Sequence, residues 1–553
     1  MKEVALSVPQ PILSQRQCQI LKLLQAGKVN KEVAQELDIG LGTVKQHIVA
    51  LFKKLNVCNR AMAVSRGMSI QHEQERHGQA LRVDGLLERR PCVVLSIALP
   101  EDTNPPTVRL MHGSLGELAS ASDALFLARK GNAGDIIFGL QQITVYDLAI
   151  ALQSVRSVHN DLLKHDPPAA ENMRASLIAG MAVVSMRRFG GWTEEAIAST
   201  AIATARELLN STPPGFSALD RSVLDIARVL GIGVRLDILP VMPIQEIKNL
   251  PWSGSPQTHP FFDRNDALTT LKTAMKKASL KRTANRRGGL VYVKGELGMG
   301  KSRLCAEILM RCINNGGEGR LFRCLPSLLK TNLYDTDNRV YCSAEEVTLL
   351  LRTKPARIPA MVVVDDLHLL TKIQQVLLNA AATDAVSLGK LVIFTGRRDL
   401  TGSGDHPSET IHLPRLAEEA IEKLVRKLLG KGRSSRQARK IKDISSAAAG
   451  VPLFAVELAQ HPEMEPLPLP LRIVINARLD SLHLDRILLR AVAKSPAPAS
   501  LRDLAATLDE DADSVRLQVE KTVAAGVLKW GANDGISFTH PLLRRAIISL
   551  IME

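Results

Sequence analysis

One stretch, Gly295-Glu-Leu-Gly298-Met-Gly300-Lys301-Ser302, constrains the fold more than any other part of the chain. It has the pattern GxxxxGK[S/T], it follows the apolar run 290–293, and a helical pattern begins at residue 303. A buried strand, a glycine-rich turn and a helix are therefore predicted in that order. Glycines let backbone N–H groups approach an anion closely, and a helix N-terminus carries partial positive charge. The sequence predicts a phosphate-binding loop within an α/β sheet.

The motif also assigns roles to its side chains. We expect Lys301 to reach the β and γ phosphates of a nucleotide and the Ser302 hydroxyl to ligate Mg²⁺. Gly295, Gly298 and Gly300 are expected to bind the phosphates through the backbone. ATP or ADP with Mg²⁺ are thus the predicted cofactors.

Two further apolar runs end in polar residues that fit the same chemistry. Residues 361–364 are followed by Asp365 and Asp366. We expect Asp365 to hold the magnesium, directly or through water, and Asp366 to orient or deprotonate the attacking water. Residues 391–394 are followed by Thr395, which suits a sensor of the nucleotide. After it come Arg397 and Arg398, which are expected to neutralise charge.

Residues 260–553 resemble the regulatory P-loop ATPases of the STAND class, which are of the AAA type. The resemblance rests on Pro260-Phe-Phe-Asp263-Arg264, on Asp365-Asp366-Leu-His368, on Gly450-Val-Pro452-Leu-Phe454 with Glu457, and on Phe538-Thr-His540-Pro. That family usually has Gly where Asp263 stands. The resemblance implies that Arg264, Pro452 and His540 contact the nucleotide. It also implies a switch that holds ADP when off, and that takes up ATP and oligomerises when on.

The N-terminal region has a different pattern. Apolar residues recur at helical spacing between 13 and 55, Asn30 is placed to cap a helix, and Gly40-Leu-Gly42 provides a tight turn. This spacing predicts a helix-turn-helix with a recognition helix over 43–55. The expected DNA contacts are Thr43, Lys45, Gln46 and His47 on the recognition helix, with Lys31, Lys53, Lys54 and Arg60 on flanking phosphates.

This region resembles the LuxR-type helix-turn-helix of transcription regulators. The matching positions are Leu13-Ser14, Gly27, Asn30-Lys31-Glu32-Val33-Ala34, Leu37, Thr43-Val44-Lys45, His47, Lys54-Leu55, Val57 and Arg60. The resemblance implies a module that reads double-stranded DNA as a dimer. In that family the module usually lies at the C-terminus, whereas here it is N-terminal.

Charge and composition agree with a polyanionic partner. The 553 residues include 71 Lys and Arg against 56 Asp and Glu, a net charge of +15. Residues 14–66 hold nine basic and three acidic residues, so they contribute +6 of that surplus. Aromatic residues make up 3%, which speaks against single-strand binding by base stacking. The scattered cysteines and the absence of an apolar leader or a long apolar stretch predict a cytoplasmic protein without membrane contact.

Residues 91–240 alternate short apolar runs with helical patterns, which indicates an α/β domain. They resemble the class III nucleotide cyclase homology domain, which is ferredoxin-like. In our alignment Ala98 occupies the position of the first metal-binding aspartate, and Gly134-Asp135 matches the second. Residues 202–206 match an Asn-x-x-x-Arg element without its asparagine. Because one carboxylate cannot assemble a two-metal site, the resemblance implies an inactive domain used for dimerisation or sensing. An unrelated α/β domain is the alternative.

The predicted fold is multidomain, α and α/β. The expected segments are 1–70 (helix-turn-helix), 71–90 (linker), 91–240 (cyclase-like), 241–260 (Pro-rich linker), 261–412 (ATPase core), 413–465 (helical lid) and 466–553 (winged-helix-like). We expect an ATP-dependent transcription regulator in which nucleotide state controls self-association and DNA binding, with slow ATP hydrolysis as a reset. A signal ligand or partner protein is also expected. The alternatives are an enzyme proper tethered to DNA, either a nucleotide cyclase or an ATPase motor, and a nucleotide-locked scaffold.

Overall fold

A computed structural model describes most of the chain as two compact units, Met1–Asp84 and Gly85–Glu553. In the first unit it describes residues 20, 23, 28, 30–36, 44, 47–48 and 50. In the second it describes residues 85–553 except 130, 196, 231–260, 280–287, 326–332, 337–339, 398–408, 431–434, 462–465, 497, 532–533 and 553.

The first unit contains helix α2 (Asn30–Glu36), which begins at the predicted capping residue. Ile20, Val33, Val44 and Ile48 are buried. These are positions of the predicted apolar stripe, so the described part of this unit has the core that the helical spacing predicts.

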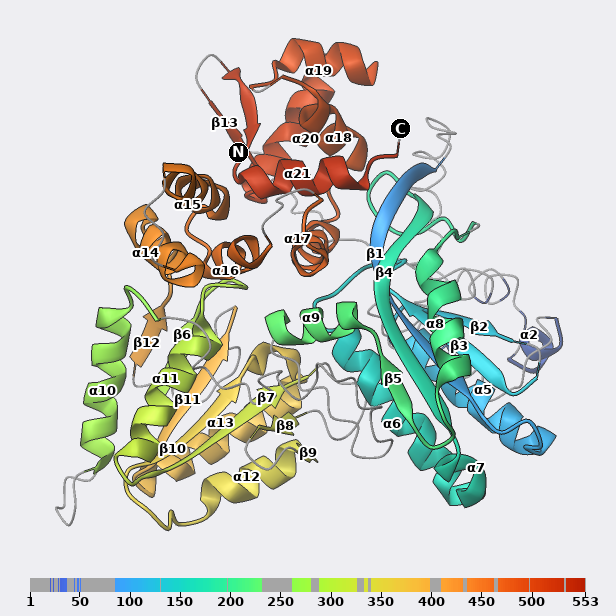
Figure 1. Ribbon diagram of the computed structural model, residues 1–553, viewed down its shortest axis with the longest axis horizontal. Coiled ribbons are helices and arrows are strands. Elements are labelled where there is room, and N and C mark those ends of the chain that lie inside the picture. The colour runs from blue at the N-terminus through green and yellow to red at the C-terminus, as the bar shows by residue number, and fades with distance from the viewer. Residues whose placement is uncertain are drawn as a thin grey trace. The chain divides into compact units, whose positions relative to one another are not determined.

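The N-terminal part of the second unit, called here the middle domain, is built on a five-stranded sheet in the order β2-β3-β1-β4-β5 (Figure 1). Its strands are β1 (Leu86–Ala98), β2 (Leu125–Ala128), β3 (Ala133–Phe138), β4 (Arg174–Met186) and β5 (Ser217–Leu219). Its helices are α5 (Pro105–Ala121), α6 (Asp147–His165), α7 (Pro167–Glu171), α8 (Thr200–Ser211) and α9 (Arg221–Leu230). The succession β1-α5-β2-β3-α6-β4 with antiparallel pairing is that of a ferredoxin-like unit.

Strand β1 shows how this sheet is packed. Val93 and Leu95 face the core formed with α5, α6 and α9, while Cys92 and Val94 face α8, as the two-residue period of a strand requires. The strand begins at Leu86, inside the range expected to be a linker. Glu88 and Arg90 are buried there in ion pairs, so charge alone did not indicate solvent exposure.

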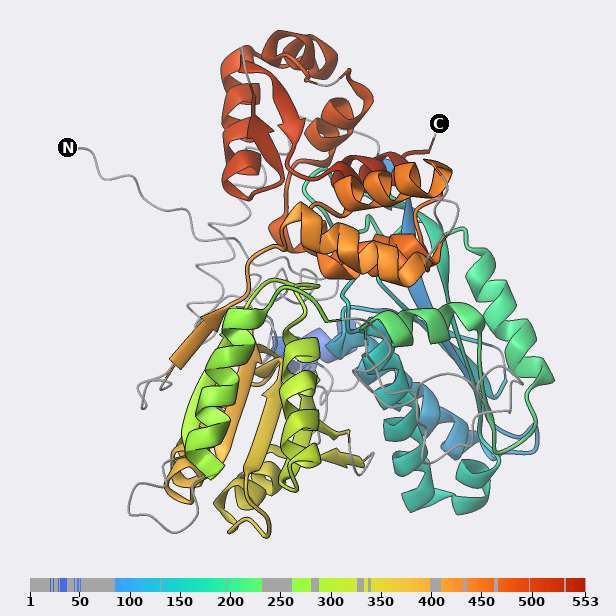
Figure 2. The ribbon, with the colours of Figure 1, turned by 60° about the vertical axis from the view of Figure 1, so that its left-hand side comes forward.

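The next part of the second unit, expected from sequence to be an ATPase core, is a seven-stranded sheet in the order β12-β6-β11-β10-β7-β8-β9, with helices on both faces. Its strands are β6 (Gly289–Lys294), β7 (Glu318–Cys324), β8 (Leu333–Asp335), β9 (Val340–Cys342), β10 (Ala360–Asp365), β11 (Leu391–Gly396) and β12 (Glu409–His412). Helices α10 (Asn265–Ser279) and α11 (Lys301–Asn314) cover one face (Figure 2), and α12 (Ala344–Arg352) and α13 (Lys372–Ser387) cover the other. Strands β12, β6, β11, β10 and β7 are parallel, so their carboxyl ends meet at one edge.

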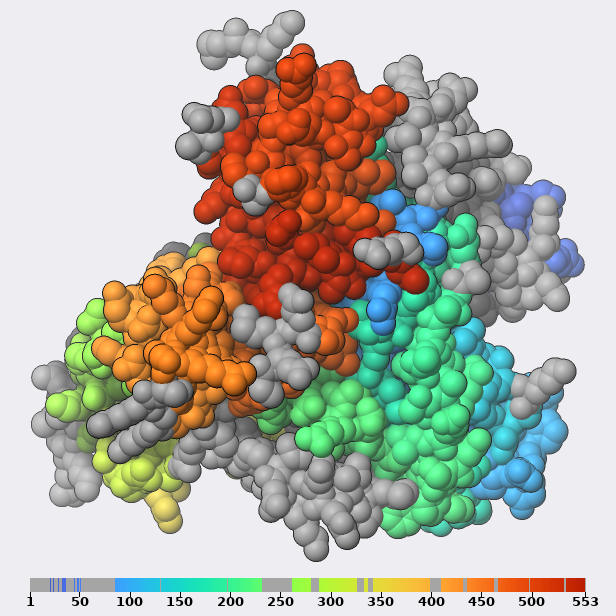
Figure 3. All heavy atoms as spheres, turned by 45° about the horizontal axis from the view of Figure 1, so that its top comes forward, coloured from blue at the N-terminus to red at the C-terminus, as the bar shows by residue number. Residues whose placement is uncertain are grey.

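The C-terminal part, where a helical lid and a winged-helix-like segment are expected, is mostly helical. It comprises α14 (Glu418–Leu429), α15 (Ser435–Ala448), α16 (Pro452–Gln460), α17 (Leu469–Leu482), α18 (Arg486–Lys494), α19 (Leu501–Leu508), α20 (Ala512–Ala524), the hairpin β13 (Leu528–Trp530) and β14 (Ile536–Phe538), and α21 (Pro541–Leu550). Helix α17 belongs to two cores, since Ile473 packs in the middle domain and Leu471 packs with the C-terminal helices. Figure 3 shows the C-terminal elements against β1, which α17 and α21 both contact.

In the described part of the chain, no helix combines the length and the apolar character that crossing a bilayer requires.

Candidate nucleotide-binding site

The glycine-rich loop joins β6 to α11, and two of its glycines have left-handed backbone conformations. Gly298 has φ of 81° and Gly300 has φ of 88°, values that residues with a Cβ adopt only with strain. A Cβ on Gly298 would lie 2.9 Å from the Leu453 Cβ, whereas a Cβ on Gly300 would meet no atom within 4 Å. Gly298 thus allows the loop to pack against α16, and the space beside Gly300 is open to a ligand.

Lys301 is buried at the first position of α11. Its Nζ donates hydrogen bonds to the carbonyl oxygens of Gly295 at 2.9 Å and Glu296 at 3.0 Å. Burial lowers the pKa of Lys301, and the nearby carboxylates of Asp366 and Asp365 oppose that shift. The loop therefore holds the ammonium group at its mouth, where phosphate oxygens would be stronger acceptors than these carbonyls.

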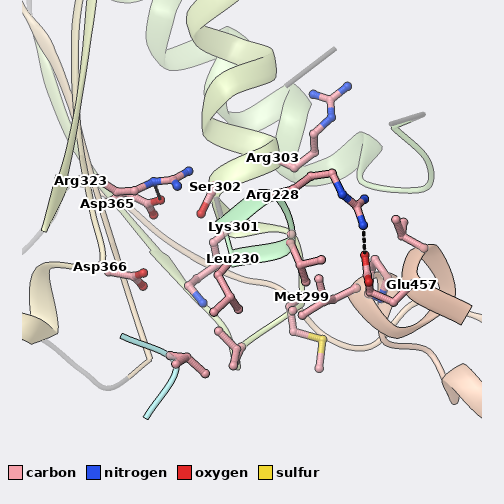
Figure 4. Close-up of a pocket in the computed structure, with 18 of the residues that line it drawn as sticks. Arg228, Leu230, Met299, Lys301, Ser302, Arg303, Arg323, Asp365, Asp366 and Glu457 are labelled. Carbon is pink, nitrogen blue, oxygen red and sulfur yellow. Dashed lines mark ion pairs between the residues drawn. The ribbon is translucent and has the colours of Figure 1, made fainter. Parts of the chain in front are cut away.

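Asp365 and Asp366 follow β10, and Thr395 at the end of the neighbouring strand β11 joins them. The Thr395 hydroxyl donates to Asp365 Oδ1 and accepts a 2.9 Å hydrogen bond from the backbone N–H of Asp366. Asp365 is buried, and its Oδ2 has no hydrogen-bond partner, although Arg323 Nε lies 3.7 Å away. Ser302, Asp365 and Asp366 face the same space (Figure 4).

These oxygens fit a divalent cation. Mg²⁺ prefers oxygen ligands and keeps several ligands from water or phosphate. Among the described residues there is no group of three or more His, Cys, Asp or Glu side chains that could hold a metal alone. Ser302 and the unsatisfied oxygen of Asp365 would therefore hold the ion together with nucleotide oxygens and water.

Asp366 has the environment of a proton acceptor. Burial and, to a smaller extent, the charge of Asp365 raise its pKa to about 6, while Lys301 and Arg397 oppose the shift. Its φ of 59° lies in the left-handed region, so its backbone is held in a sparsely populated conformation at the site. A carboxylate with a pKa near neutrality suits the predicted role of orienting or deprotonating water.

Eight of the predicted nucleotide and metal residues line one cavity of about 290 Å³. They are Arg264, Gly298, Gly300, Lys301, Ser302, Asp365, Asp366 and Pro452. Arg264 also has a structural part, because its guanidinium donates to the carbonyl oxygens of Met299 at 3.1 Å and Pro414 at 2.7 Å. It therefore ties the loop to the segment that leads into α14.

Other predicted residues lie elsewhere. Gly295 contributes its carbonyl to Lys301 without lining the cavity. Arg397 and His540 line a neighbouring cavity of about 460 Å³. The two ring nitrogens of His540 contact the Ala448 carbonyl and the Leu542 N–H, each at 3.1 Å, so this side chain caps α21. Arg398 lies outside the described residues.

The structure adds residues that sequence reasoning missed. Arg323, at the end of β7, lines the cavity and pairs with Asp365. Tyr146 and Arg228 of the middle domain line it too. No sequence motif marks these three residues. Tyr146 accepts a hydrogen bond from Arg397, which lies 251 positions away in the chain.

In the middle domain, Asp135 of β3 lies opposite Ser96 of β1, and Ala98 lies opposite Ala133. Ser96 donates a 2.7 Å hydrogen bond to Asp135 Oδ1, and Arg206 Nη2 lies 2.8 Å from Oδ2. Arg129 Nε is a further cation, 3.4 Å from Oδ1. This carboxylate is thus neutralised by arginines and has no second carboxylate opposite it in the ladder.

Of the predicted DNA contacts, the described residues include Lys31, which lies in α2, and His47, which is helical and partly exposed. Thr43, Lys45, Gln46, Lys53, Lys54 and Arg60 lie outside the described residues.

Comparison with known proteins bears on the N-terminal region. Residues 11–66 match the model of bacterial regulatory proteins of the luxR family. Over 52 residues the chain is 46% identical to the HTH-type transcriptional regulator MalT of Vibrio campbellii, and over 51 residues it is 49% identical to the putative HTH-type transcriptional regulator YhjB of Escherichia coli. These matches cover 9% of this chain and only 6% and 26% of the two relatives.

Solved structures are similar only at a low level. The RuvB Holliday junction branch migration motor of Thermotoga maritima is 18% identical, with 50% of this chain and 93% of that chain covered and a TM-score of 0.30. The guanylyl cyclase Cya2 is 16% identical, with 26% and 81% covered and a TM-score of 0.21. Neither score is high enough to support a conclusion. The family model, by contrast, shows that residues 11–66 carry a helix-turn-helix of the luxR family of bacterial regulatory proteins.

Proposed function

We propose that this protein is a DNA-binding transcription regulator whose C-terminal ATPase module controls self-association and DNA binding through its ATP or ADP state. The observation that carries the proposal is the cavity in which Lys301, Ser302, Asp365 and Asp366 meet, within a chain that begins with a luxR-family segment. Loop, cation ligands and acid pair together suit a nucleoside triphosphate with Mg²⁺.

The parts have distinct tasks in this proposal. Lys301 and the loop N–H groups bind phosphates, Ser302 and Asp365 hold the metal, and Asp366 orients water for slow hydrolysis. A magnesium ion held there would neutralise phosphate charge. Association of several chains would then raise the effective concentration of DNA-reading modules and so tighten DNA binding without any new contact.

The proposal is tested with the full-length protein in three measurements. Equilibrium binding of N-methylanthraniloyl-ADP with Mg²⁺ should be weakened at least about tenfold by Lys301→Ala, because a charge-assisted contact to phosphate is lost. Lys276→Ala, an exposed lysine of α10, is the control. Molar mass by light scattering and duplex binding by fluorescence anisotropy should both differ between ADP and a non-hydrolysable ATP analogue. Equal mass and equal DNA affinity in the two states would refute the switch.

A nucleotide cyclase is the competing function. The arginines around Asp135 and the serine opposite it argue against a two-metal centre. Incubation of the protein with ATP or GTP and Mn²⁺ should therefore yield no cyclic nucleotide. Robust formation of a cyclic product would contradict the proposal.

A further inference from the structure

We propose that the middle domain supplies the closing wall of the nucleotide pocket and must move away before nucleotide can be exchanged. This inference rests on the proposed nucleotide binding and extends it to the control of that site. The wall consists of Val145, Tyr146 and Ala149 at the start of α6 and Arg228 and Leu230 at the end of α9, and we call it the middle-domain wall.

The middle-domain wall lines the same cavity as the phosphate-binding loop. Leu230 and Arg228 lie beside Met299 and Lys301 in the pocket (Figure 4). With the wall in place the volume is about 290 Å³. That is just below the range of roughly 300–1,000 Å³ for small-molecule pockets, so the wall limits the space in which a nucleotide would bind.

Arg228 fastens the wall to α16, the helix that begins at Pro452, which is predicted to contact the nucleotide. Arg228 Nη2 lies 3.6 Å from Glu457 Oε1, and Arg228 Nη1 donates to Gln460, both on α16. Glu457 is 1% exposed and follows Pro452 on the same helix. Burial raises the pKa of Glu457 to about 7, and Arg228 opposes that rise. Movement of the wall would therefore leave a buried carboxyl group without its arginine.

A second contact fastens the wall at the phosphate end. Arg397 Nη2 donates a 3.3 Å hydrogen bond to the Tyr146 hydroxyl. Tyr146 is close enough to Asp366 and Asp365 that these carboxylates add to the effect of burial in raising its pKa. Tyr146 of the wall therefore lies next to the acid pair of Asp365 and Asp366.

Buried contacts hold the middle domain to α17 and α18 more firmly than the two polar contacts hold the wall. Arg90 of β1 pairs with Asp480 of α17, and Arg486 of α18 pairs with both Asp480 and Glu88. Ile473 of α17 lies in the core of the middle domain. This buried anchor contrasts with the two polar contacts at the pocket. We therefore expect the domain to open at the pocket while it stays attached to α17 and α18.

The test measures release of N-methylanthraniloyl-ADP, chased with unlabelled ADP in a stopped-flow instrument. Arg228→Met keeps most of the side-chain bulk and removes the ion pair, and Glu457→Gln removes the buried charge. Each should speed release by about tenfold, because an ion pair between a partly exposed arginine and a buried carboxylate is broken. The double variant should be no faster than the faster single one, since both substitutions remove the same ion pair. Tyr146→Phe should have a smaller effect, about threefold, as a neutral hydrogen bond is lost. Arg109→Met, at an exposed site on α5, should match the wild type.

A second readout does not depend on the nucleotide. Amide hydrogen exchange of the unliganded protein should increase at 145–151 and 224–230 in Arg228→Met, and should stay unchanged in β6. Normal nucleotide binding with release rates and exchange within twofold of the wild type would overturn the gate alone. Failure of the wild type to bind the labelled nucleotide would overturn the proposed function and the gate together.

Discussion

The guanidinium of Arg90 in β1 and the carboxylate of Asp480 in α17 form a buried ion pair between residues 390 positions apart. Burial disfavours both charges, yet their attraction prevails, so the pKa of Arg90 is raised and the pKa of Asp480 is lowered. Asp480 also accepts a 2.9 Å hydrogen bond from the Ile143 N–H. This pair joins the middle domain to the C-terminal helices through charge as well as through apolar packing.

Asp480→Asn should therefore destabilise the protein by about 3–5 kcal/mol, because only Glu88 would remain to compensate the buried charges of Arg90 and Arg486. The measurement is urea unfolding followed by circular dichroism. Arg352→Met serves as control, since its ion pair with Asp384 is half exposed and should contribute under about 1 kcal/mol. The double variant Arg90→Met, Asp480→Leu should recover part of the loss; no recovery would mean that the charges are not the cause.

The two left-handed glycines of the loop should respond unequally to the same substitution. Gly300→Ala adds backbone strain but no collision, so we expect a cost of about 1 kcal/mol. Gly298→Ala adds the same strain and a clash with Leu453, for a further cost of about 1–3 kcal/mol. Thermal unfolding of both variants measures the order. Equal stability of the two variants would show that the loop and α16 can move apart at Leu453 without lowering the stability of the protein.

The core of the site was predictable from sequence because it is local. Buried parallel strands read as apolar runs, and the polar residues that follow them must meet at one sheet edge. That logic placed Asp365 and Thr395 near the loop. It was silent on Arg323, because β7 reads Glu-Gly-Arg-Leu-Phe-Arg-Cys and has no apolar run.

Long-range contacts were beyond local patterns for a physical reason. The charges at Glu88 and Arg90 are compensated by Asp480 and Arg486, which lie far along the chain, so a buried strand start looked like a polar linker. In the same way Arg228 meets α16 across 232 positions. Composition shows the charge of a segment, but it does not show the distant residue that compensates the charge when the segment is buried.

Thr395 should matter for magnesium because it bonds both members of the acid pair. Thr395→Val keeps the size and removes the hydroxyl, so the amide of Asp366 loses its acceptor. We expect the affinity for Mg²⁺ in the presence of ADP to fall by about tenfold or more, as is usual when a partner of a metal ligand is lost. Calorimetric titration with Mg²⁺ measures this, and Thr395→Ser should retain most of the wild-type affinity. Unchanged magnesium dependence in the valine variant would exclude this role.

The stability of the C-terminal part should fall with acidification through His540. Burial lowers its pKa to about 4 from 6.5, and Arg415 and Arg478 contribute to the shift. Its Nδ1 accepts the Leu542 N–H, so protonation would break a helix cap. The unfolded state therefore binds the proton first, and stability is lost as pH falls from 6.5 to about 4.

Urea unfolding of wild type and His540→Asn between pH 7.5 and 4 isolates this contribution, because asparagine can cap α21 without titrating. The wild type should lose up to about 3 kcal/mol more than the variant. His165→Asn, at an exposed position, should leave the pH dependence unchanged. Parallel pH profiles of wild type and His540→Asn would contradict the assignment.

The helix-turn-helix should bind duplex DNA with a salt dependence set by its proposed phosphate contacts. Lys31, Lys53, Lys54 and Arg60 would give a slope of log K against log salt of about −4 for one bound chain. Lys53→Ala should reduce that slope by about 0.9 on every sequence, because one phosphate contact is lost. Gln46→Ala should leave the slope unchanged but weaken the preference for duplexes selected from a random pool, because it is proposed to touch bases. Fluorescence anisotropy at several salt concentrations measures both the slope and the sequence preference, with Lys276→Ala as the control. A slope that none of these variants alters would place the DNA contacts elsewhere.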